Sequence, residues 1–305
     1  MDVARGRFAP SPTGSLHLGN LRTALIAWLV ARSAPGEFIV RMEDLDRVTA
    51  SRAHEQGQLS DLTRIGIDWD GEVVRQSERF DRYYAAIELL RTRGVVYECY
   101  CTRREVRLAA EAPNGPDTDG RYPETCRDLS ESRLRQHRDA GRRPALRLRS
   151  DGHEETFDDL FLGPQRGPVD DFVIQRNDGV PAYNLAVVVD DAAQGVTEVV
   201  RGDDLVASTP RQIALHRLLE LRVPTYAHIP LVLAPDGSRL AKRHGAVTLA
   251  DLGARGQTVS DVIGRLAASI GIDAGDHPVA ARDLLDRFDL DRVPGSPWVL
   301  RDDEL

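Results

Sequence analysis

A histidine and two glycines lie in a short run near the amino terminus, where a predicted strand leads into a predicted helix. The run, residues 10–20, reads PSPTGSLHLGN and contains Gly14, His17 and Gly19. A helix amino terminus offers free N–H groups and the positive end of the helix dipole, and glycine lets a ligand approach the backbone closely. His17 can donate a hydrogen bond to a phosphate oxygen. The run predicts an anion site, although it also fits a capped helix with an incidental histidine.

The chain has a single lysine, Lys242, among its 40 Lys and Arg residues. It lies in the run SRLAKRH, residues 238–244. Lysine carries a compact, mobile ammonium group and arginine a planar fork, so the two are not interchangeable. A lysine in a polar loop is a common partner of phosphate. We therefore expect Lys242 to contact a phosphate, with chance placement of one lysine as the alternative.

All three cysteines of the chain, Cys99, Cys101 and Cys126, lie within one short segment. Clustered cysteines in a cytosolic chain favour a metal site over disulfides. Tetrahedral structural zinc needs four ligands, and the cysteines supply three of them. Three reduced, buried thiols remain the alternative.

Composition is that of a soluble globular protein, with 41% hydrophobic and 29% charged residues among 305. No apolar run is long enough for a transmembrane helix, and the amino terminus lacks an apolar signal core, so we expect a cytoplasmic protein without a membrane partner. The net charge of −8 argues against wholesale coating of nucleic acid. A local basic face is still possible, because residues 130–149 contain seven arginines, although a solvated helix explains them equally well. They are Arg133, Arg135, Arg138, Arg142, Arg143, Arg147 and Arg149.

Hydrophobic periodicity predicts strands that alternate with helices, which is typical of a parallel sheet with crossover helices. The segment 112–124 is rich in Pro, Gly and Asp and is expected to be a loop, and Asn177-Asp178-Gly179 predicts a hairpin turn. The expected strands cover residues 7–9, 37–42, 94–97, 145–149, 198–201 and 229–233, and the expected helices cover residues 16–31, 50–66, 77–93 and 209–221.

The predicted fold class is α/β, with a Rossmann-like parallel sheet that an insertion splits into two halves. The sheet is expected to come from residues 1–98 and 172–245, and the insertion from residues 99–171. Residues 246–305 are expected to form a small helical subdomain. No internal repeat is present.

The two phosphate-binding runs together resemble the signatures of class I aminoacyl-tRNA synthetases, and most of all the glutamyl branch. Residues 7–14 (RFAPSPTG) with His17-Leu18-Gly19-Asn20 are similar to the first signature, and residues 239–243 (RLAKR) to the second, in which Lys242 matches the second lysine and Arg239 stands for the first. The resemblance covers roughly residues 5–250 and implies a class I synthetase fold. It implies catalytic roles for His17 and Lys242, and an ATP site with Mg²⁺ on the nucleotide. The implied ATP-binding residues are His17, Gly19, Asn20, Arg239, Leu240 and Lys242.

The same resemblance implies a pocket for L-glutamate. An arginine suits a carboxylate and a glutamate side chain suits an ammonium group, and Glu43 follows a strand end, where open α/β sheets bind ligands. Without the resemblance, Arg7, Arg201 and Glu43 would be interpreted as members of surface ion pairs. The family has an asparagine four residues after the matching tyrosine, whereas this chain has Val187, which predicts a less polar pocket wall. The implied glutamate-binding residues are Arg7, Ala9, Ser11, Glu43, Tyr183 and Arg201.

The spacing Cys-x-Cys-x20-Tyr-x3-Cys is similar to the zinc site of short glutamyl-synthetase-like proteins. The resemblance therefore implies one structural Zn²⁺ per chain, held by Cys99, Cys101, Tyr122 and Cys126. The chain stops about 60 residues after Lys242 and so is expected to lack the anticodon-binding domain of full-length glutamyl-tRNA synthetases. That is a feature of the glutamyl-queuosine tRNA(Asp) synthetases, which activate glutamate without tRNA and esterify the queuosine of tRNA(Asp).

The resemblance thus implies a ligase-type enzyme, expected as a monomer, whose partners are ATP, L-glutamate and the queuosine-bearing anticodon stem-loop of tRNA(Asp). The arginines of residues 130–149 would contact RNA phosphates. Three alternatives remain: a compact glutamyl-tRNA synthetase that charges a 3′ end, a non-catalytic paralogue that binds glutamate or RNA, and a generic nucleotidyltransferase of the same sheet type. The last does not predict the pocket that holds Arg7, Glu43, Tyr183 and Arg201.

Overall fold

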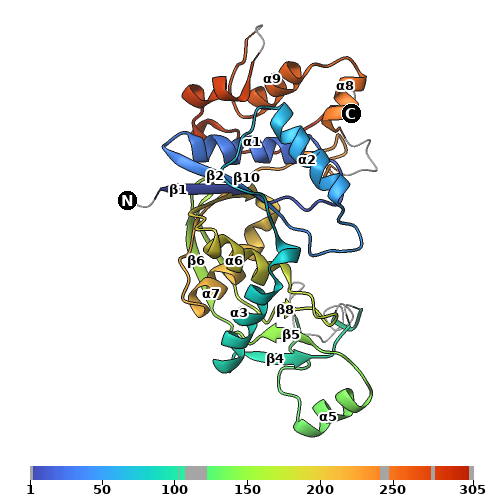
Figure 1. Ribbon diagram of the computed structural model, residues 1–305. Coiled ribbons are helices and arrows are strands. Elements are labelled where there is room, and N and C mark those ends of the chain that lie inside the picture. The colour runs from blue at the N-terminus through green and yellow to red at the C-terminus, as the bar shows by residue number, and fades with distance from the viewer. Residues whose placement is uncertain (1–2, 103, 107–121, 241–246, 276–278, 302–305) are drawn as a thin grey trace.

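The computed structural model describes residues 3–102, 104–106, 122–240, 247–275 and 279–301 (Figure 1). The strands are β1 (Ala4–Phe8), β2 (Gly36–Met42), β3 (Val74–Arg75), β4 (Val96–Cys99), β5 (Ala145–Leu148), β6 (Glu154–Asp159), β7 (Gly163–Pro168), β8 (Val173–Gln175), β9 (Glu198–Gly202), β10 (Thr225–Ile229), β11 (Val232–Leu233) and β12 (Trp298–Val299). The α-helices are α1 (Leu18–Arg32), α2 (Arg52–Arg64), α3 (Phe80–Thr92), α5 (Glu131–Asp139), α6 (Tyr183–Ala193), α7 (Thr209–Leu218), α8 (Leu249–Ala254) and α9 (Val259–Ser269).

The main sheet has seven strands in the order β3-β2-β1-β9-β10-β6-β7. All neighbours pair in parallel except β6 and β7, which form an antiparallel hairpin. The chain runs outward from β1 to β2 and β3 on one side, and from β9 to β10 on the other. Between β1 and β9 the strand order therefore reverses, and open α/β sheets bind ligands outside the carboxyl ends of strands at such a point.

Helix α1 covers one face of this sheet and is buried on nearly all sides. Its apolar residues share one core cluster with β1, β2, β10 and the helices near the carboxyl terminus. The approach of α1 to β1 requires a glycine, because a Cβ atom on Gly6 would lie 2.9 Å from the Cβ of Ala31. Close packing of this kind fixes the last turn of α1 against the middle of β1.

Helices α3, α6 and α7 pack around a second apolar cluster, which continues into the insertion. Helix α6 is an apolar helix that carries two buried carboxylates, Asp190 and Asp191, near its end. A third, smaller cluster contains Ile39, Val199 and Ile213. Figure 1 shows the resulting order along the molecule, with α1, α8 and α9 at one end, the main sheet in the middle and the insertion at the other end.

Strands β4, β5 and β8, which lie within and on both sides of the expected insertion, form a separate three-stranded antiparallel sheet in the order β4-β5-β8, with α5 beyond it (Figure 1). The strand expected at residues 94–97 is therefore β4, but it does not belong to a parallel sheet as expected. The hairpin β6–β7 was not expected at all, and it extends the main sheet by pairing with β10 at Tyr226 and Asp159. The division of the chain into domains at residues 98, 171 and 245 stays a prediction.

Most other expected elements are present within a few residues of their predicted bounds. The turn at Asn177–Gly179 is confirmed, with the Gly179 N–H donating to the Arg176 carbonyl. The strand expected at residues 229–233 is wrong in position, because the long strand is Thr225–Ile229 and only the short strand Val232–Leu233 follows it. A proline at position 230 separates them, and proline cannot donate to a sheet ladder. The α/β fold class is confirmed.

The region after residue 246 is mainly helical, as expected, and a buried arginine of α1 ties it to the main sheet. Arg22 donates to the Pro230 carbonyl at 2.6 Å and to the Ser269 side chain and carbonyl at 3.2 Å each. Two short strands, β11 and β12, pair the same region with the segment after β10. Among the described residues, no helix has the length and apolar character that spanning a membrane requires.

Candidate active site

A cavity of about 680 Å³ lies at the carboxyl ends of β1 and β9, where the strand order reverses. Every residue predicted to bind ATP or glutamate lines it except Lys242, which lies outside the described residues. Residues 7–20 of the first signature are thus brought together with Arg239 and Leu240 of the second. The predicted residues in its lining are Arg7, Ala9, Ser11, His17, Gly19, Asn20, Glu43, Tyr183, Arg201, Arg239 and Leu240.

His17 is the N-cap residue of α1, and its ring orientation follows from the cap. Its Nδ1 accepts from the Asn20 N–H at 3.3 Å, while the Asn20 side chain accepts from the His17 N–H at 3.1 Å. Because Nδ1 is an acceptor, the neutral ring carries its proton on Nε2. Burial lowers the pKa of His17, which favours that neutral form. The structure therefore presents an N–H donor beside the start of α1.

Gly19 leaves room for this arrangement. A Cβ atom at this position would lie 3.0 Å from two atoms of the His17 ring and 3.3 Å from the Cβ of Val232. Any side chain there would push on the imidazole.

The residues on either side of the undescribed segment 241–246 are attached beside the first signature. Arg239 pairs with Leu233 and its guanidinium contacts Asp204 at 3.0 Å, and Leu240 lines the cavity. After the undescribed residues 241–246, the Val247 carbonyl accepts from the Leu18 N–H at 3.0 Å. Lys242 thus belongs to the segment between Leu240, which lines the cavity, and Val247, which is bonded to the first residue of α1.

The loop of the first signature is held by a glutamine that the sequence did not single out. Gln58 of α2 is buried, and its amide donates to the Ser11 carbonyl at 3.0 Å and the Gly14 carbonyl at 2.7 Å. The Glu43 N–H donates to the Pro10 carbonyl at 2.9 Å. These contacts place the loop between β1 and α1 against the end of β2.

Arg7 and Glu43 are joined by a chain of alternating charges. Asp191 of α6 lies 3.6 Å from Arg7 Nε and accepts from Arg41 Nη1 at 2.7 Å, and Arg41 contacts Glu43 at 3.3 Å. Arg41 is fully buried within β2. Buried charges are tolerated when they are paired and hydrogen-bonded. Arg7 Nε is itself buried and makes no hydrogen bond to the described atoms, while Arg7 Nη1 donates to the Val200 carbonyl at 3.2 Å.

Burial raises the pKa of Glu43, and Arg41 and Arg7 oppose that rise. The side chain is nearly enclosed, with 12% of it exposed. A carboxylate in this position gains from any cation that enters the cavity. The ammonium group of an amino acid is such a cation.

Arg201 of β9 is buried and lines the same cavity. Its donors reach His228 at 3.0 Å, Gln212 at 2.8 Å and Thr209 at 2.8 Å, and its guanidinium lies 5.3 Å from the centre of the Tyr226 ring. Within the described part of the chain, no carboxylate lies within ion-pair distance of Arg201. A carboxylate ligand would therefore meet a cation that no acid of these segments neutralises.

The other predicted amino-acid contacts lie as follows. Ala9 and Ser11 belong to the loop after β1, and Tyr183 begins α6 with 39% of its surface exposed. Val187, one turn further along α6, is buried in the second apolar cluster and is not among the residues that line the cavity.

A second cavity, of about 1100 Å³, adjoins the first and shares Ser11, Glu43 and Tyr183 with it. It extends to the insertion, where Tyr100, Cys99 and Cys101 line it. Four arginines, Arg142, Arg143, Arg147 and Arg176, contribute to its walls.

The three cysteines converge at the far end of the second cavity. Their sulfur atoms lie within 4.8 Å of one another, and the Tyr122 hydroxyl lies 3.4 Å from Cys99 Sγ and 3.6 Å from Cys101 Sγ. Sulfur ligands of a tetrahedral zinc lie about 3.8 Å apart, given Zn–S bonds of about 2.3 Å. The donor set and its spacing fit a tetrahedral metal ion. Hydrogen bonds from Cys101 and Cys126 lower the pKa of Cys99 against the effect of burial, which favours a thiolate here.

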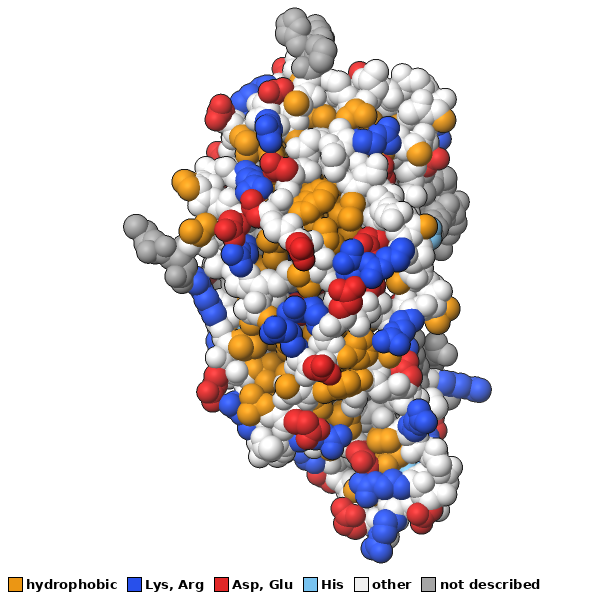
Figure 2. Space-filling model, viewed as in Figure 1, with side chains coloured by type: hydrophobic (Ala, Val, Ile, Leu, Met, Phe, Trp, Pro, Cys, Tyr) orange, Lys and Arg blue, Asp and Glu red, His pale blue; other side chains and the backbone are white. Residues whose placement is uncertain are grey.

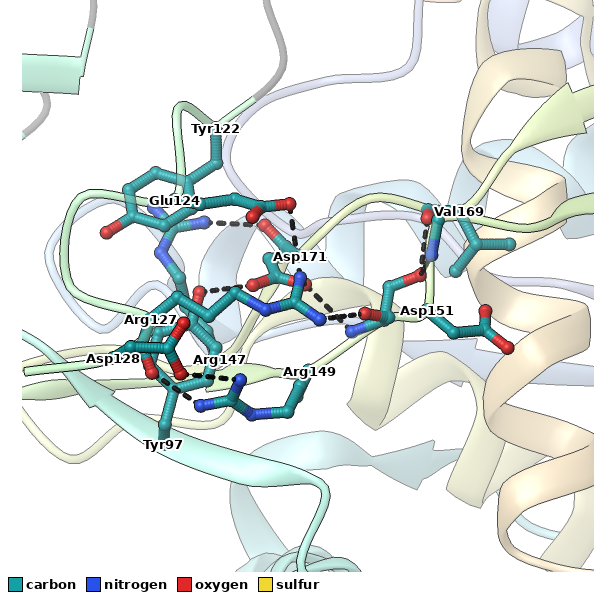
Figure 3. A network of polar contacts seen from close by, with 12 residues as sticks. Tyr97, Tyr122, Glu124, Arg127, Asp128, Arg147, Arg149, Asp151, Val169 and Asp171 are labelled. Atoms are coloured by element: carbon teal, nitrogen blue, oxygen red, sulfur yellow. Dashed lines mark hydrogen bonds and ion pairs between the residues drawn. The ribbon is translucent and has the colours of Figure 1, made fainter.

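Arg147 lies between Tyr122 and a polar network around Asp171 (Figure 3). Its guanidinium lies 3.6 Å from the centre of the Tyr122 ring, and it donates to the Asp171 carbonyl at 2.9 Å. The Asp171 side chain in turn accepts from Tyr97 at 2.6 Å, Arg127 at 3.0 Å and the Ser150 N–H at 2.8 Å. Arg147 is buried, and its Nε has no partner among the described atoms.

The arginines of residues 130–149 do not form one free basic face. Arg138 pairs with Glu98, Arg142 donates to the Tyr100 carbonyl, Arg149 pairs with Asp128, and Arg147 is buried. Figure 2 shows the same intermixing of positive and negative side chains over one face of the molecule. Within the described segments, Arg133, Arg135 and Arg143 are exposed and form no ion pair.

Sequence reasoning missed the residues that support the predicted ones, although some left a signal. Arg41 lies in an apolar strand and Asp190-Asp191 ends an apolar helix, and charges in such places are seldom unpaired. No such charge within an apolar element of the sequence pointed to Gln58, Asp159 or His228.

Comparison with known proteins agrees with this geometry. Residues 3–305 match the family model for the catalytic domain of class I tRNA synthetases (E and Q). The chain is 57% identical over 300 residues to the glutamyl-Q tRNA(Asp) synthetase of Nocardia farcinica, covering 98% of this chain and 94% of that protein. It is 39% identical over 312 residues to the glutamate–tRNA ligase of Citrifermentans bemidjiense, covering 100% of this chain but 65% of that protein.

Among solved structures, a glutamate tRNA ligase from Elizabethkingia meningosepticum, in complex with its amino acid, superimposes with a TM-score of 0.82 at 27% identity. The match covers 99% of this chain and 68% of that one. The chain therefore belongs to the class I glutamyl and glutaminyl tRNA synthetase catalytic-domain family.

Proposed function

We propose that this protein activates glutamate with ATP and transfers it to the queuosine of tRNA(Asp). The observation that carries the proposal is the single cavity at the strand-order reversal, which both signatures and the charged amino-acid residues line. The chain is 57% identical to a glutamyl-Q tRNA(Asp) synthetase but 39% identical to a glutamate–tRNA ligase. This difference supports queuosine as the acceptor over the 3′ end of a tRNA.

In the first step, a carboxylate oxygen of glutamate attacks the α-phosphorus of ATP and pyrophosphate leaves, which gives glutamyl-adenylate. The protein supplies no nucleophile, so its contribution is positioning and charge stabilisation. Arg201 would bind the side-chain carboxylate, Glu43 the ammonium group, and Arg7 with Ser11 and the backbone of Ala9 the reacting end. The hydroxyl of Tyr183 would add a hydrogen bond.

The phosphates would meet the N–H of His17 Nε2, the start of α1 and the second signature. Gly19 and Asn20 shape that helix start, and Arg239 and Leu240 border the cavity from the other side. We propose that Lys242 binds the phosphate oxygens as charge develops on the leaving pyrophosphate. Mg²⁺ carried by ATP would neutralise part of the same charge.

In the second step, a hydroxyl of the queuosine diol attacks the carbonyl carbon of the adenylate and AMP leaves. The second cavity adjoins the first at Ser11, Glu43 and Tyr183, so it is the route by which an extended nucleoside would reach the carbonyl. The exposed residues Arg133, Arg135 and Arg143 are the available contacts for phosphates of the anticodon stem-loop.

We propose that the metal at Cys99, Cys101, Tyr122 and Cys126 is one structural Zn²⁺. When bound, zinc would supply a fixed cross-link between β4 and the segment that contains Tyr122 and Cys126. The reduced cysteine cluster also supports a cytoplasmic location. A monomer remains our expectation.

The test uses an anticodon stem-loop of tRNA(Asp) with queuosine and a 3′ phosphate, incubated with ATP and radiolabelled glutamate. The 3′ phosphate removes the terminal diol, so the queuosine diol is the remaining target of periodate. We expect label on this RNA, no label after prior periodate oxidation, and no label on the matched stem-loop with guanosine in place of queuosine.

Other outcomes point to the alternatives. Labelling of queuosine-free, full-length tRNA at its 3′ end would make the protein a compact glutamyl-tRNA synthetase. Glutamate-dependent ATP–pyrophosphate exchange without any labelled RNA would refute the queuosine acceptor. Binding of glutamate without exchange would indicate the non-catalytic paralogue.

A further inference from the structure

Three neighbouring strands present a row of hydrogen-bonded side chains that ends at Arg201. Asp159 is the last residue of β6, His228 lies on β10, and Arg201 lies on β9 directly opposite His228 in the parallel register. Asp159 Oδ2 lies 2.6 Å from His228 Nδ1, and His228 Nε2 lies 3.0 Å from Arg201 Nε. All three residues are buried.

The contact to Arg201 determines which nitrogen of His228 carries the proton. A guanidinium N–H can only donate, so His228 Nε2 must accept. The proton of the neutral ring is therefore on Nδ1, where it points at Asp159. Burial lowers the pKa of His228, and the positive charge of Arg201 acts in the same direction, although Asp159 opposes them.

Asp159 is itself fixed by the hairpin turn that follows it. Its Oδ1 accepts from the N–H groups of Phe161 at 3.0 Å, Leu162 at 2.9 Å and His228 at 3.1 Å. One carboxylate oxygen is thus committed to the backbone and the other to the histidine. The hairpin β6–β7 consequently sets the ring position of His228.

The other acceptors around Arg201 are neutral as well. They are the Gln212 side-chain oxygen, the Thr209 hydroxyl and the Leu205 carbonyl, and Gln212 is held in place by its bond to Asn184 at 3.1 Å. Orientation by neutral acceptors fixes the guanidinium without cancelling its charge. A carboxylate in the place of His228 would anchor Arg201 equally well but would neutralise it.

We propose that Asp159 and His228 are positioning residues for Arg201, which hold it through the Nδ1–H tautomer of His228 so that its full charge is available to the side-chain carboxylate of the amino acid. This inference rests on the proposed function and adds a reason for preferring glutamate to glutamine. An uncompensated cation in a buried site favours a carboxylate over a neutral carboxamide.

The sharpest variant is Asp159→Asn, which changes the polarity of one atom at nearly constant shape. The asparagine oxygen would stay with the three backbone N–H groups, so its NH₂ group would face His228 Nδ1. The imidazole would then carry its proton on Nε2 and present it to the N–H of Arg201. Loss of one hydrogen bond to a charged group costs about 1.5–3 kcal/mol, or roughly ten- to a hundredfold in affinity.

The experiment measures ATP–pyrophosphate exchange for wild type, Asp159→Asn, His228→Gln, His228→Leu and the double variant Asp159→Asn/His228→Gln. We expect Asp159→Asn and His228→Leu to raise KM for glutamate about tenfold or more, with KM for ATP close to wild type, and to narrow the preference for glutamate over glutamine. His228→Gln keeps an oxygen that can face Arg201 and should be mild. A glutamine at position 228 has no tautomer for Asp159 to select. Asp159→Asn should therefore cause little further rise in KM for glutamate in the His228→Gln background.

The matched control is Asp70→Asn, because Asp70 also accepts a backbone N–H, from Phe38 at 2.8 Å, and an arginine N–H, from Arg32 at 2.8 Å. Asp70 does not contact Arg201, so Asp70→Asn should leave the ratio of KM for glutamate to KM for ATP unchanged. Histidine ¹⁵N NMR supplies a second readout, in which Asp159→Asn should convert one histidine from the Nδ1–H to the Nε2–H form.

The outcomes separate this inference from the proposed function. If wild type shows no glutamate-dependent exchange, the proposed function fails and the inference fails with it. If wild type is active and Asp159→Asn keeps the wild-type KM for glutamate, the inference alone is overturned. The inference would also be overturned if Asp159→Asn raised KM for glutamate equally in the wild-type and His228→Gln backgrounds. Parallel increases in KM for glutamate and KM for ATP would overturn it as well.

Discussion

Glu43 experiences two opposing influences, because burial raises the pKa of its carboxyl while Arg41 and Arg7 lower it. The net direction is upward, so Glu43 takes up a proton at a higher pH than an ordinary glutamate, whose pKa is about 4.3. If ionised Glu43 holds the ammonium group of the amino acid, acidification must weaken that contact. We predict that KM for glutamate rises as the pH falls below neutrality, while KM for ATP changes little, as measured by pyrophosphate exchange across pH.

Glu43→Gln provides the control for this prediction. It should start from a high KM for glutamate and lose the acidic limb of the profile. Retention of the same limb in the variant would assign it to another group.

The sequence predicted which residues would bind the ligand, but it did not predict which other residues hold them in place. The types and spacing of Arg7, Glu43 and Arg201, with the family resemblance, led to residues that line one cavity. Asp159 and His228 were not found, because the contact between them joins positions 69 residues apart on strands whose pairing the sequence did not reveal. A buried charge signals that a partner exists but does not say where the chain places it.

The insertion provides an element-scale prediction, because β5 carries Arg147 to the face of Tyr122. Three thiolates and a phenolate would give a zinc site a net negative charge, and a buried cation close by offsets it. We predict that Arg147→Met weakens zinc binding about ten- to a hundredfold. Competition with a chromophoric chelator measures the affinity, and the absorption of the Co²⁺-loaded protein reports the coordination.

Arg149→Met is the matched control, because Arg149 lies on the same segment and also stacks on a tyrosine, Tyr97, at 5.3 Å. It pairs with Asp128 and does not contact the cysteines. Equal losses of affinity in the two variants would mean that the metal depends on the fold of the insertion and not on the charge of Arg147.

Elements with a clear apolar pattern were predictable, and the hairpin β6–β7 shows why others were not. Its two strands read EETFDD and GPQRGP, which are rich in acidic residues, proline and glycine that are depleted in strands. Pairing with each other and with β10 makes them strands, and those contacts are non-local. The element that orients His228 was therefore hidden at the level of local sequence.

For the whole molecule, Arg22 links α1, the segment after β10 and α9. Burial lowers the pKa of Arg22 to about 10, with Asp203 opposing, which reflects a cation held mainly by neutral oxygens. We predict that Arg22→Met lowers the free energy of unfolding by about 1–3 kcal/mol, because buried carbonyl groups lose their donor. Chemical denaturation measures the loss, and hydrogen exchange should show faster exchange in α9.

Arg32→Met is the comparison for this variant. Arg32 lies on the same helix and pairs with Asp68 and Asp70, which are about half exposed. Partly exposed pairs contribute about 0–1 kcal/mol, so this variant should be the milder one. An equal or larger loss for Arg32→Met, or unchanged exchange in α9 of Arg22→Met, would contradict the role given to Arg22.

The buried charges at the cavity also bear on the thermodynamics of the free protein. A carboxyl whose pKa is raised on folding contributes stability only below its unfolded pKa, and that contribution is lost as the pH rises through the folded pKa. At neutral pH, the ionised carboxyl of Glu43 therefore opposes folding. Bound glutamate would bring an ammonium group to Glu43 and a carboxylate to Arg201, and a ligand that binds only the native state stabilises it. The bound substrate would thus place an opposite charge beside each of these two buried groups and stabilise the folded protein.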